Sequence, residues 1–142
     1  MKEEDMRAEV IVKAVKGADR GRTYSDLPRA VDSLLRAGTK GHKGFEVAYF
    51  VYSGCSSCIG ELLDFLDVIE RTGLELPVII VPSSRHDQPT IEYYVEQTGV
   101  TPSSDMTIIK PMLPVSELKE LNGRVVILYD GIPVNGFYFA NR

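Results

Sequence analysis

The sequence holds few of the residues that stabilise small proteins by forming disulfide bonds or binding metal ions. Of its 142 residues, only two are cysteine and two are histidine, and tryptophan is absent. Two cysteines are too few for a disulfide framework. A chain of 142 residues nevertheless buries enough surface to fold as one domain without staples, so residues 1–142 are expected to form a single domain.

Long apolar runs and strongly basic segments are also missing. No stretch approaches the ~20 apolar residues that cross a bilayer, so we expect no membrane-spanning segment. The acidic start MKEEDMRAEV lacks the apolar centre of a secretory signal. The protein is therefore expected to be cytoplasmic if the chain is complete, and extracytoplasmic if a signal segment has been removed. The net charge of −4 argues against nucleic acid as a partner.

Apolar runs alternate with helical periodicities along the chain. Two nearly unbroken apolar runs predict central strands that are covered on both faces. We predict strands at 8–15, 45–52, 76–82, 106–110, 125–129 and 134–140. We predict helices at 24–38 (capped by Ser25 or Asp26), from the cysteines to Gly73, at 90–99 and, for a turn or two, at 114–123.

This order of elements predicts the fold class. Strands that alternate with helices need crossover connections, which favour a partly parallel sheet. The last two strands flank Asp130 and Gly131, a typical hairpin turn, and add antiparallel pairing. The expected fold is an α/β three-layer sandwich with a mixed sheet and a C-terminal β-hairpin.

Both cysteines lie where a buried strand turns into a helix, in the sequence VYSGCSSCIGE. The positive end of the helix dipole favours a thiolate at Cys55, and thiolates are the nucleophilic form of cysteine. Cys58 would lie in the first helical turn, close enough to attack a mixed disulfide at Cys55. The pair closes too short a loop to remove much chain entropy, so stapling is a weak reason for it.

Two other interpretations of the cysteine pair remain. A metal site needs about four ligands, and only His42 and His86 are strong candidates beside the two cysteines, so we expect no metal. The pair could also be two buried, inert thiols.

The buried strand, the sequence CSSC and the amphipathic helix, within this order of elements, resemble the thioredoxin superfamily over residues 8–140. The long segment before the hairpin is similar to that of bacterial redoxins that resemble envelope thiol-disulfide reductases. The resemblance implies a thioredoxin-like fold, with Cys55 as the exposed nucleophile and Cys58 as its buried partner. It also implies dithiol–disulfide exchange with a protein thiol or disulfide, without an organic cofactor.

The sequence departs from the family pattern at several positions. Gly54 stands where thioredoxins usually have tryptophan, and Tyr49 stands where they bury a carboxylate. The residues at 122–124 (Asn-Gly-Arg) replace the proline that precedes the hairpin in the family. The chain ends at Arg142, without room for the usual last helix, so a second copy or another partner is expected to cover that sheet face.

The loop SSRHDQ follows the strand that neighbours the one before Cys55. Ligands gather at the carboxyl ends of such strands, so Arg85 and His86 are candidates for tuning the thiols, although a solvated loop is the simpler interpretation. The main functional hypothesis is a thiol-disulfide oxidoreductase that acts through Cys55 and Cys58. The alternative is a thioredoxin-like interaction or redox-sensing domain whose disulfide is regulatory or vestigial.

Overall fold

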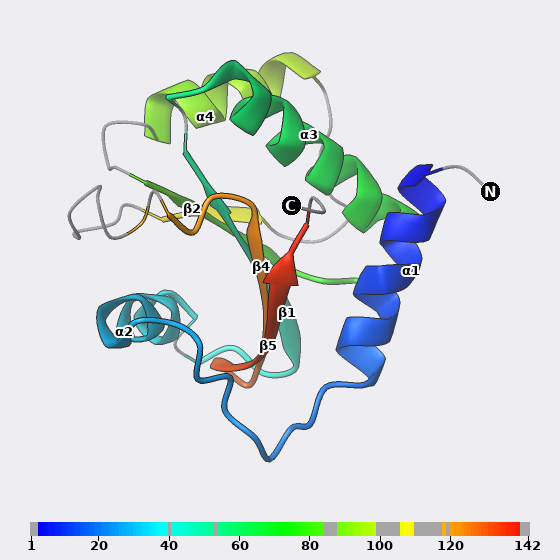
Figure 1. Ribbon diagram of the computed structural model, residues 1–142, viewed down its shortest axis with the longest axis vertical. Helices are drawn as coiled ribbons and strands as arrows, with labels where there is room; N and C mark the ends of the chain where they lie inside the picture. The colour runs from blue at the N-terminus through cyan, green and yellow to red at the C-terminus, as the bar shows by residue number, and fades with distance from the viewer. Residues whose placement is uncertain are drawn as a thin grey trace.

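The protein is described by a computed structural model that covers residues 3–39, 41–52, 54–83, 88–98, 106–109, 118 and 120–139. Helices and strands alternate through most of the chain, as Figure 1 shows. The elements are α1 (Glu3–Lys16), α2 (Arg29–Gly38), β1 (Phe45–Val51), α3 (Ser56–Arg71), β2 (Val78–Pro82), α4 (Gln88–Thr98), β3 (Met106–Ile108), β4 (Arg124–Tyr129) and β5 (Ile132–Tyr138).

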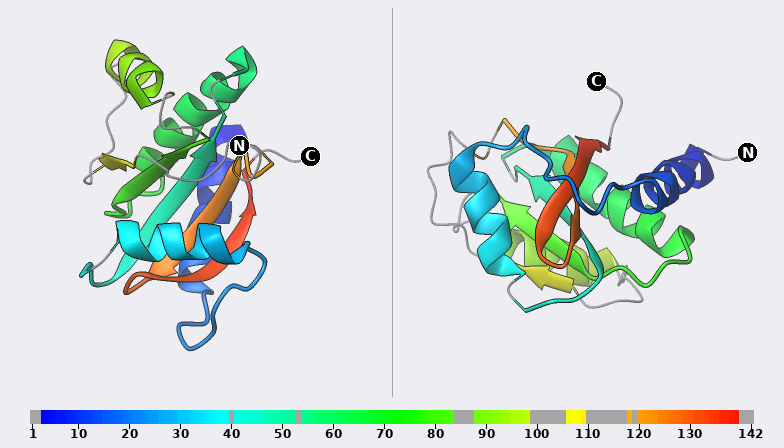
Figure 2. Two further views of the ribbon diagram at one scale, coloured as in Figure 1. Left: turned by 90° about the vertical axis from the view of Figure 1, so that its left-hand side faces the viewer. Right: turned by 90° about the horizontal axis from the view of Figure 1, so that it is seen from below.

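The strands form one five-stranded sheet in the order β3-β2-β1-β4-β5. β1 runs parallel to β2, and β2 runs parallel to β3. β4 pairs antiparallel with β1 on its other side, and β5 pairs antiparallel with β4. This arrangement confirms the predicted α/β class with a mixed sheet, and Figure 2 shows helices on both faces.

The three inner strands β1, β2 and β4 bury residues on both faces of the sheet, as their apolar runs predict. Alternate residues point to opposite sides and join two separate hydrophobic clusters. One cluster packs under α1, α3 and α4 and includes Val47, Tyr49, Val51, Val78, Ile80, Val125 and Ile127. The other packs under α2 and includes Ala48, Phe50, Ile79, Val81, Val126 and Leu128.

The expected first strand at 8–15 is wrong, because these residues lie within the helix α1. Ala8, Ile11 and Val15 are buried, and their spacing of three and four residues matches one face of a helix. Val10 is exposed, although a strand with alternating faces would place it on the same face as the buried Ala8. The β-branched composition of this segment favours a strand locally, but packing of the helical face against the sheet overrides it.

α1 packs beside α3 on the same side of the sheet. The guanidinium of Arg7 lies 4.8 Å from the ring centre of Phe139, which follows β5. The helix therefore covers the β5 side of the sheet. That packing removes the reason for expecting a second copy or another partner there, and any partner on this face stays a prediction.

Smaller differences from the sequence-based expectations concern element ends. α2 begins at Arg29, after Pro28, rather than at a cap formed by Ser25 or Asp26. The turn between β4 and β5 has Asp130 at φ 51° and Gly131 at φ 80°, as a type I′ hairpin requires. The extra strand at 106–110 is confirmed as β3, whereas half of the helix expected at 114–123 falls outside the described residues.

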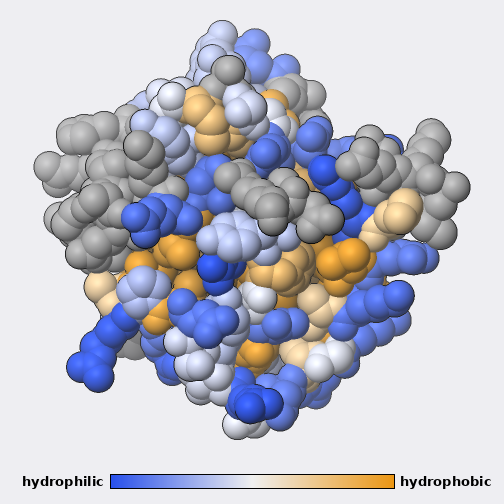
Figure 3. Space-filling view, viewed as in Figure 1, coloured by the Kyte–Doolittle hydropathy of each residue, from blue (hydrophilic) through white to orange (hydrophobic). Residues whose placement is uncertain are grey.

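Among the described residues, no helix combines the length and apolar character needed to cross a bilayer. Figure 3 shows hydrophobic residues interspersed with hydrophilic ones over the face seen there.

Candidate functional site: a disulfide at the start of α3

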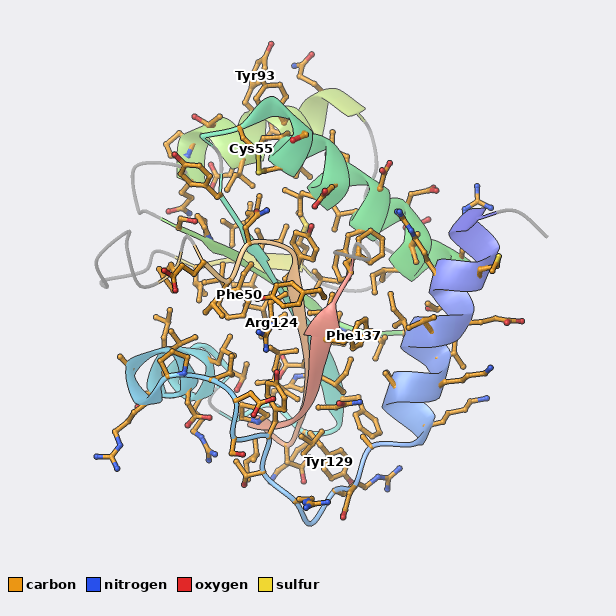
Figure 4. All side chains as sticks on the ribbon, viewed as in Figure 1. Phe50, Cys55, Tyr93, Arg124, Tyr129 and Phe137 are labelled. Carbon is orange, nitrogen blue, oxygen red and sulfur yellow. A yellow bond between two sulfur atoms is a disulfide. The ribbon has the colours of Figure 1, made fainter. Side chains whose placement is uncertain are left out.

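The carboxyl end of β1 holds the residues that lead into the cysteine pair. Val51 is fully buried, and its carbonyl accepts hydrogen bonds from the N–H of Ser83 at 2.9 Å and from Ser83 Oγ at 3.2 Å. Ser83 follows β2, so the ends of the two parallel strands are tied together. Farther along the chain α3 begins, with Cys55 at the helix N-cap (Figure 4).

Cys55 and Cys58 form a disulfide, with their Cα atoms 5.3 Å apart. The backbone N–H of Cys58 donates to Sγ of Cys55 at 3.0 Å, so the sulfur acts as the cap of α3. Ser57 Oγ lies 3.4 Å from the same sulfur. Cys55 is partly exposed, whereas Cys58 is 8 % exposed. Cys55 is therefore the more accessible residue of the pair, and Cys58 is the enclosed one.

Asn122 contacts Cys58, the enclosed residue of the pair. Its Nδ2 donates to Sγ of Cys58 at 3.4 Å, and its Oδ1 accepts from the backbone N–H of Tyr52 at 2.8 Å. The side chain is 8 % exposed. It stands just before β4, where the resemblance leads one to expect a proline, and no peptide bond among the described residues is cis.

The sequence did not identify Asn122 as a site residue, because Asn122 and Cys58 are 64 positions apart. One signal was available. An Asn-Gly pair directly before a buried strand marks a turn, and such a turn at this edge of the sheet brings a polar side chain to the cysteines.

The two aromatic residues near the turn have different surroundings. The ring of Tyr52 lies over Gly54, so closely that a β-carbon at position 54 would overlap it. Tyr49 is fully buried, and its ring stacks on Phe65 with the centres 4.5 Å apart. Tyr49 is thus part of the core under α3, at the position where the resemblance leads one to expect a carboxylate.

The other predicted site residues lie away from the disulfide or outside the described structure. Arg85 and His86 belong to residues 84–87, which are not described. His42 precedes β1, at the end of that strand opposite Cys55. Within the described residues, no three side chains of His, Cys, Asp or Glu gather closely enough to hold a metal ion.

A second buried polar group lies at the same far end of β1. Glu46 is 6 % exposed, and its Oε1 has no hydrogen-bond partner among the described residues. Desolvation raises the pKa of this carboxyl, and the charge of nearby His42 offsets part of the rise. Glu46 lies on the α2 side of the sheet and has no contact with the disulfide.

Comparisons of the chain with protein-family models, with curated proteins and with solved structures find no match. The geometry around Cys55 and Cys58 is therefore the basis for assigning a function.

Proposed function

We propose that the protein is a thiol-disulfide oxidoreductase of the thioredoxin superfamily, acting on a protein disulfide or dithiol through Cys55 and Cys58. The observation that carries the proposal is the position of Cys55 at the N-terminus of α3. There its sulfur accepts the N–H of Cys58 at 3.0 Å while the residue remains partly exposed. An inert structural disulfide needs neither the exposure nor the donor.

The same contact supports an activated thiolate at Cys55 in the reduced protein. The first turn of a helix carries about half a unit of positive charge, and an N–H aimed at sulfur stabilises its anion. Free cysteine has a pKa of about 8.5, so the reduced Cys55 should titrate below that value. Cys58 is enclosed, which suits the resolving thiol that meets only its neighbour.

The reaction then proceeds by two exchanges. The Cys55 thiolate attacks one sulfur of the partner's disulfide, the partner's S–S bond breaks, and the released thiolate takes up a proton. Cys58 gives up its proton and attacks Cys55 Sγ in the mixed disulfide, which releases the second thiol. The partner gains two electrons and two protons, and the protein is left with its disulfide. In the reverse direction the protein oxidises a dithiol.

The order of elements around the site also supports a thioredoxin-like fold. β1, α3 and β2 form a parallel unit with the cysteines at its first turn, and the antiparallel hairpin β4–β5 follows. The edge beside β2 is occupied by β3.

A redox titration with thiol trapping tests the proposal. A single two-electron transition is expected, with a potential near −270 mV for a reductant or near −120 mV for an oxidant (both approximate). Reduced native protein should also react with an alkylating reagent at Cys55 faster than its urea-unfolded form does. Slow alkylation of both native thiols would contradict the enzyme and favour the redox-sensing alternative.

Single cysteine variants provide the matched controls. Cys55→Ser should abolish exchange with a disulfide substrate, because the accessible nucleophile is lost. Cys58→Ser should instead accumulate a mixed disulfide, because nothing resolves it. Equal behaviour of the two variants would contradict the assigned roles.

A further inference from the structure

The side chain of Asn122 joins the two chain segments that meet at the disulfide. The N–H of Tyr52 is a donor only, so the atom of Asn122 that receives it must be the amide oxygen. This fixes the orientation of the amide and turns its NH₂ group to Sγ of Cys58, 3.4 Å away. The amide is therefore oriented by the protein, with a donor held against the enclosed sulfur.

The backbone around Asn122 holds this orientation in place. The N–H of Gly123 donates to the carbonyl of Phe50 in β1, and its carbonyl accepts from the N–H of Phe139 after β5, both at 2.8 Å. Gly123 adopts φ 83°, a conformation that is costly for other residues. Asn122 thus enters the site from a turn that is anchored to strands on both sides.

The enclosed sulfur needs such a donor when the disulfide is opened. An external thiolate attacks Sγ of Cys55, the bond between the two sulfurs breaks, and its electron pair moves to Sγ of Cys58. The resulting thiolate lies in a residue that is only 8 % exposed, where water can solvate little of its charge. A thiol that leaves as a stabilised anion leaves faster.

We propose that Asn122 is a catalytic residue of this exchange, which stabilises the Cys58 thiolate as the leaving group through its Nδ2–H donor. The inference rests on the proposed oxidoreductase function and assigns the task to a residue outside the CxxC sequence. Tyr49, at the position of the family's carboxylate, is packed on Phe65 in the core. The donor at the buried cysteine comes instead from the segment before β4.

The experiment measures the rate at which dithiothreitol reduces the oxidised full-length protein. Asn122→Leu removes both hydrogen bonds at similar volume and should slow reduction by about tenfold, the effect of losing one charge-assisted hydrogen bond. Asn122→Asp keeps an acceptor for the N–H of Tyr52 but places a carboxylate oxygen against Cys58. It should slow reduction at least as much, and the loss should shrink as the carboxyl becomes protonated at lower pH.

Asn135→Leu is the matched control, because Asn135 also bonds a backbone N–H, that of Gly136 in β5, away from the disulfide. It should leave the rate unchanged. A second readout is the pKa of the Cys58 thiol in a Cys55→Ala background, which should rise when Asn122 is also replaced by leucine. This pKa reports the protonation of the Cys58 sulfur, and a purely structural effect of the substitution would not change it.

The outcomes separate this inference from the proposed function. If wild-type protein is reduced rapidly and the folded Asn122 variants match it in both rate and Cys58 pKa, the role of Asn122 is wrong and the oxidoreductase stands. If wild-type protein is reduced no faster than its urea-unfolded chain, both proposals fail. If Asn122→Leu does not fold, the reduction rate and pH profile of Asn122→Asp test the role of Asn122 by the same criteria.

Discussion

The ring of Tyr52 rests on Gly54, and the absence of a side chain at position 54 is what allows the contact. A β-carbon there would overlap the far end of the ring, including its hydroxyl. The phenol side chain of Tyr52 therefore lies beside the turn that presents Cys55. Gly54 is required for space, and no unusual backbone angle is involved.

Replacing Gly54 by alanine should displace the Tyr52 ring. Because the atoms in the way belong to the end of a rotatable side chain, we expect the protein to stay folded and to lose about 1 kcal/mol of unfolding free energy. Urea unfolding gives the energy, and nitration of Tyr52 followed by mass spectrometry should increase as the ring moves into water.

Gly60 in α3 is the control for Gly54→Ala. Nothing lies within 4 Å of a β-carbon at Gly60, so Gly60→Ala should stabilise the protein by up to about 1 kcal/mol through helix propensity. A Gly54→Ala protein with unchanged stability and unchanged nitration would show that the ring does not rest there.

Gly123→Ala should both strain the backbone and move Asn122. The residue has φ 83°, so an alanine there should cost about 1–2 kcal/mol. Gly73→Ala is a matched variant, because Gly73 has φ 70° and open space around it. Both variants should be destabilised in urea, but only Gly123→Ala should also slow reduction of the disulfide. Equal rates of disulfide reduction in the two variants would show that the turn at Gly123 does not affect the disulfide site.

Ile11 tests the packing of α1 on the sheet. Its side chain is fully buried, so Ile11→Ala should lower the unfolding free energy by about 2–4 kcal/mol. The adjacent Val10 is 53 % exposed, and Val10→Ala should change the unfolding free energy by less than about 0.5 kcal/mol. Thermal or urea unfolding of the two variants distinguishes them. Similar losses at both positions would contradict a helix with one buried face.

Glu46 should make the stability of the protein depend on pH. Desolvation raises its pKa above 4.5, so the folded protein binds this proton more readily than the unfolded chain does. The free energy of unfolding therefore falls as the pH rises from about 4.5 through the raised value. Glu46→Gln should flatten that decline and stabilise the protein at pH 7 by about 1 kcal/mol or less, because nearby His42 offsets part of the desolvation of the carboxyl.

Urea unfolding over a range of pH checks the prediction for Glu46. The exposed Glu70, at the end of α3, is a control for the same substitution at the surface, and Glu70→Gln should change the unfolding free energy at pH 7 by less than about 0.5 kcal/mol. A Glu46→Gln profile parallel to the wild type would mean that Glu46 ionises equally well in both states.

Patterns of local sequence predict the centre of this fold well. The apolar runs at β1 and β2 identify strands that are buried on both faces, and Asp130 with Gly131 marks the hairpin. These signals succeed because central strands and tight turns impose strong demands on each residue. They also place Cys55 correctly at the junction of β1 and α3.

The same patterns fail where distant packing decides the structure. Residues 8–15 are rich in valine and isoleucine, yet their helical face is chosen by contact with α3 and the sheet. Asn122 reaches Cys58 only because β4 pairs with β1 and the turn at Gly123 closes on Phe50. Neither interaction leaves a local periodicity, so a single sequence read along its length does not show them.

The contact between Asn122 and Cys58 exists only in the folded chain, whereas the disulfide closes a sequence separation of three in any state. A thermodynamic cycle then links oxidation to folding. If the Asn122 donor favours the reduced cysteine pair in the native protein, the reduction potential of the pair is higher in the native protein than in the unfolded chain. Each 30 mV of that difference makes the reduced protein more stable than the oxidised one by about 1.4 kcal/mol. The bond would thus weaken the fold that holds it, contrary to the usual effect of a disulfide.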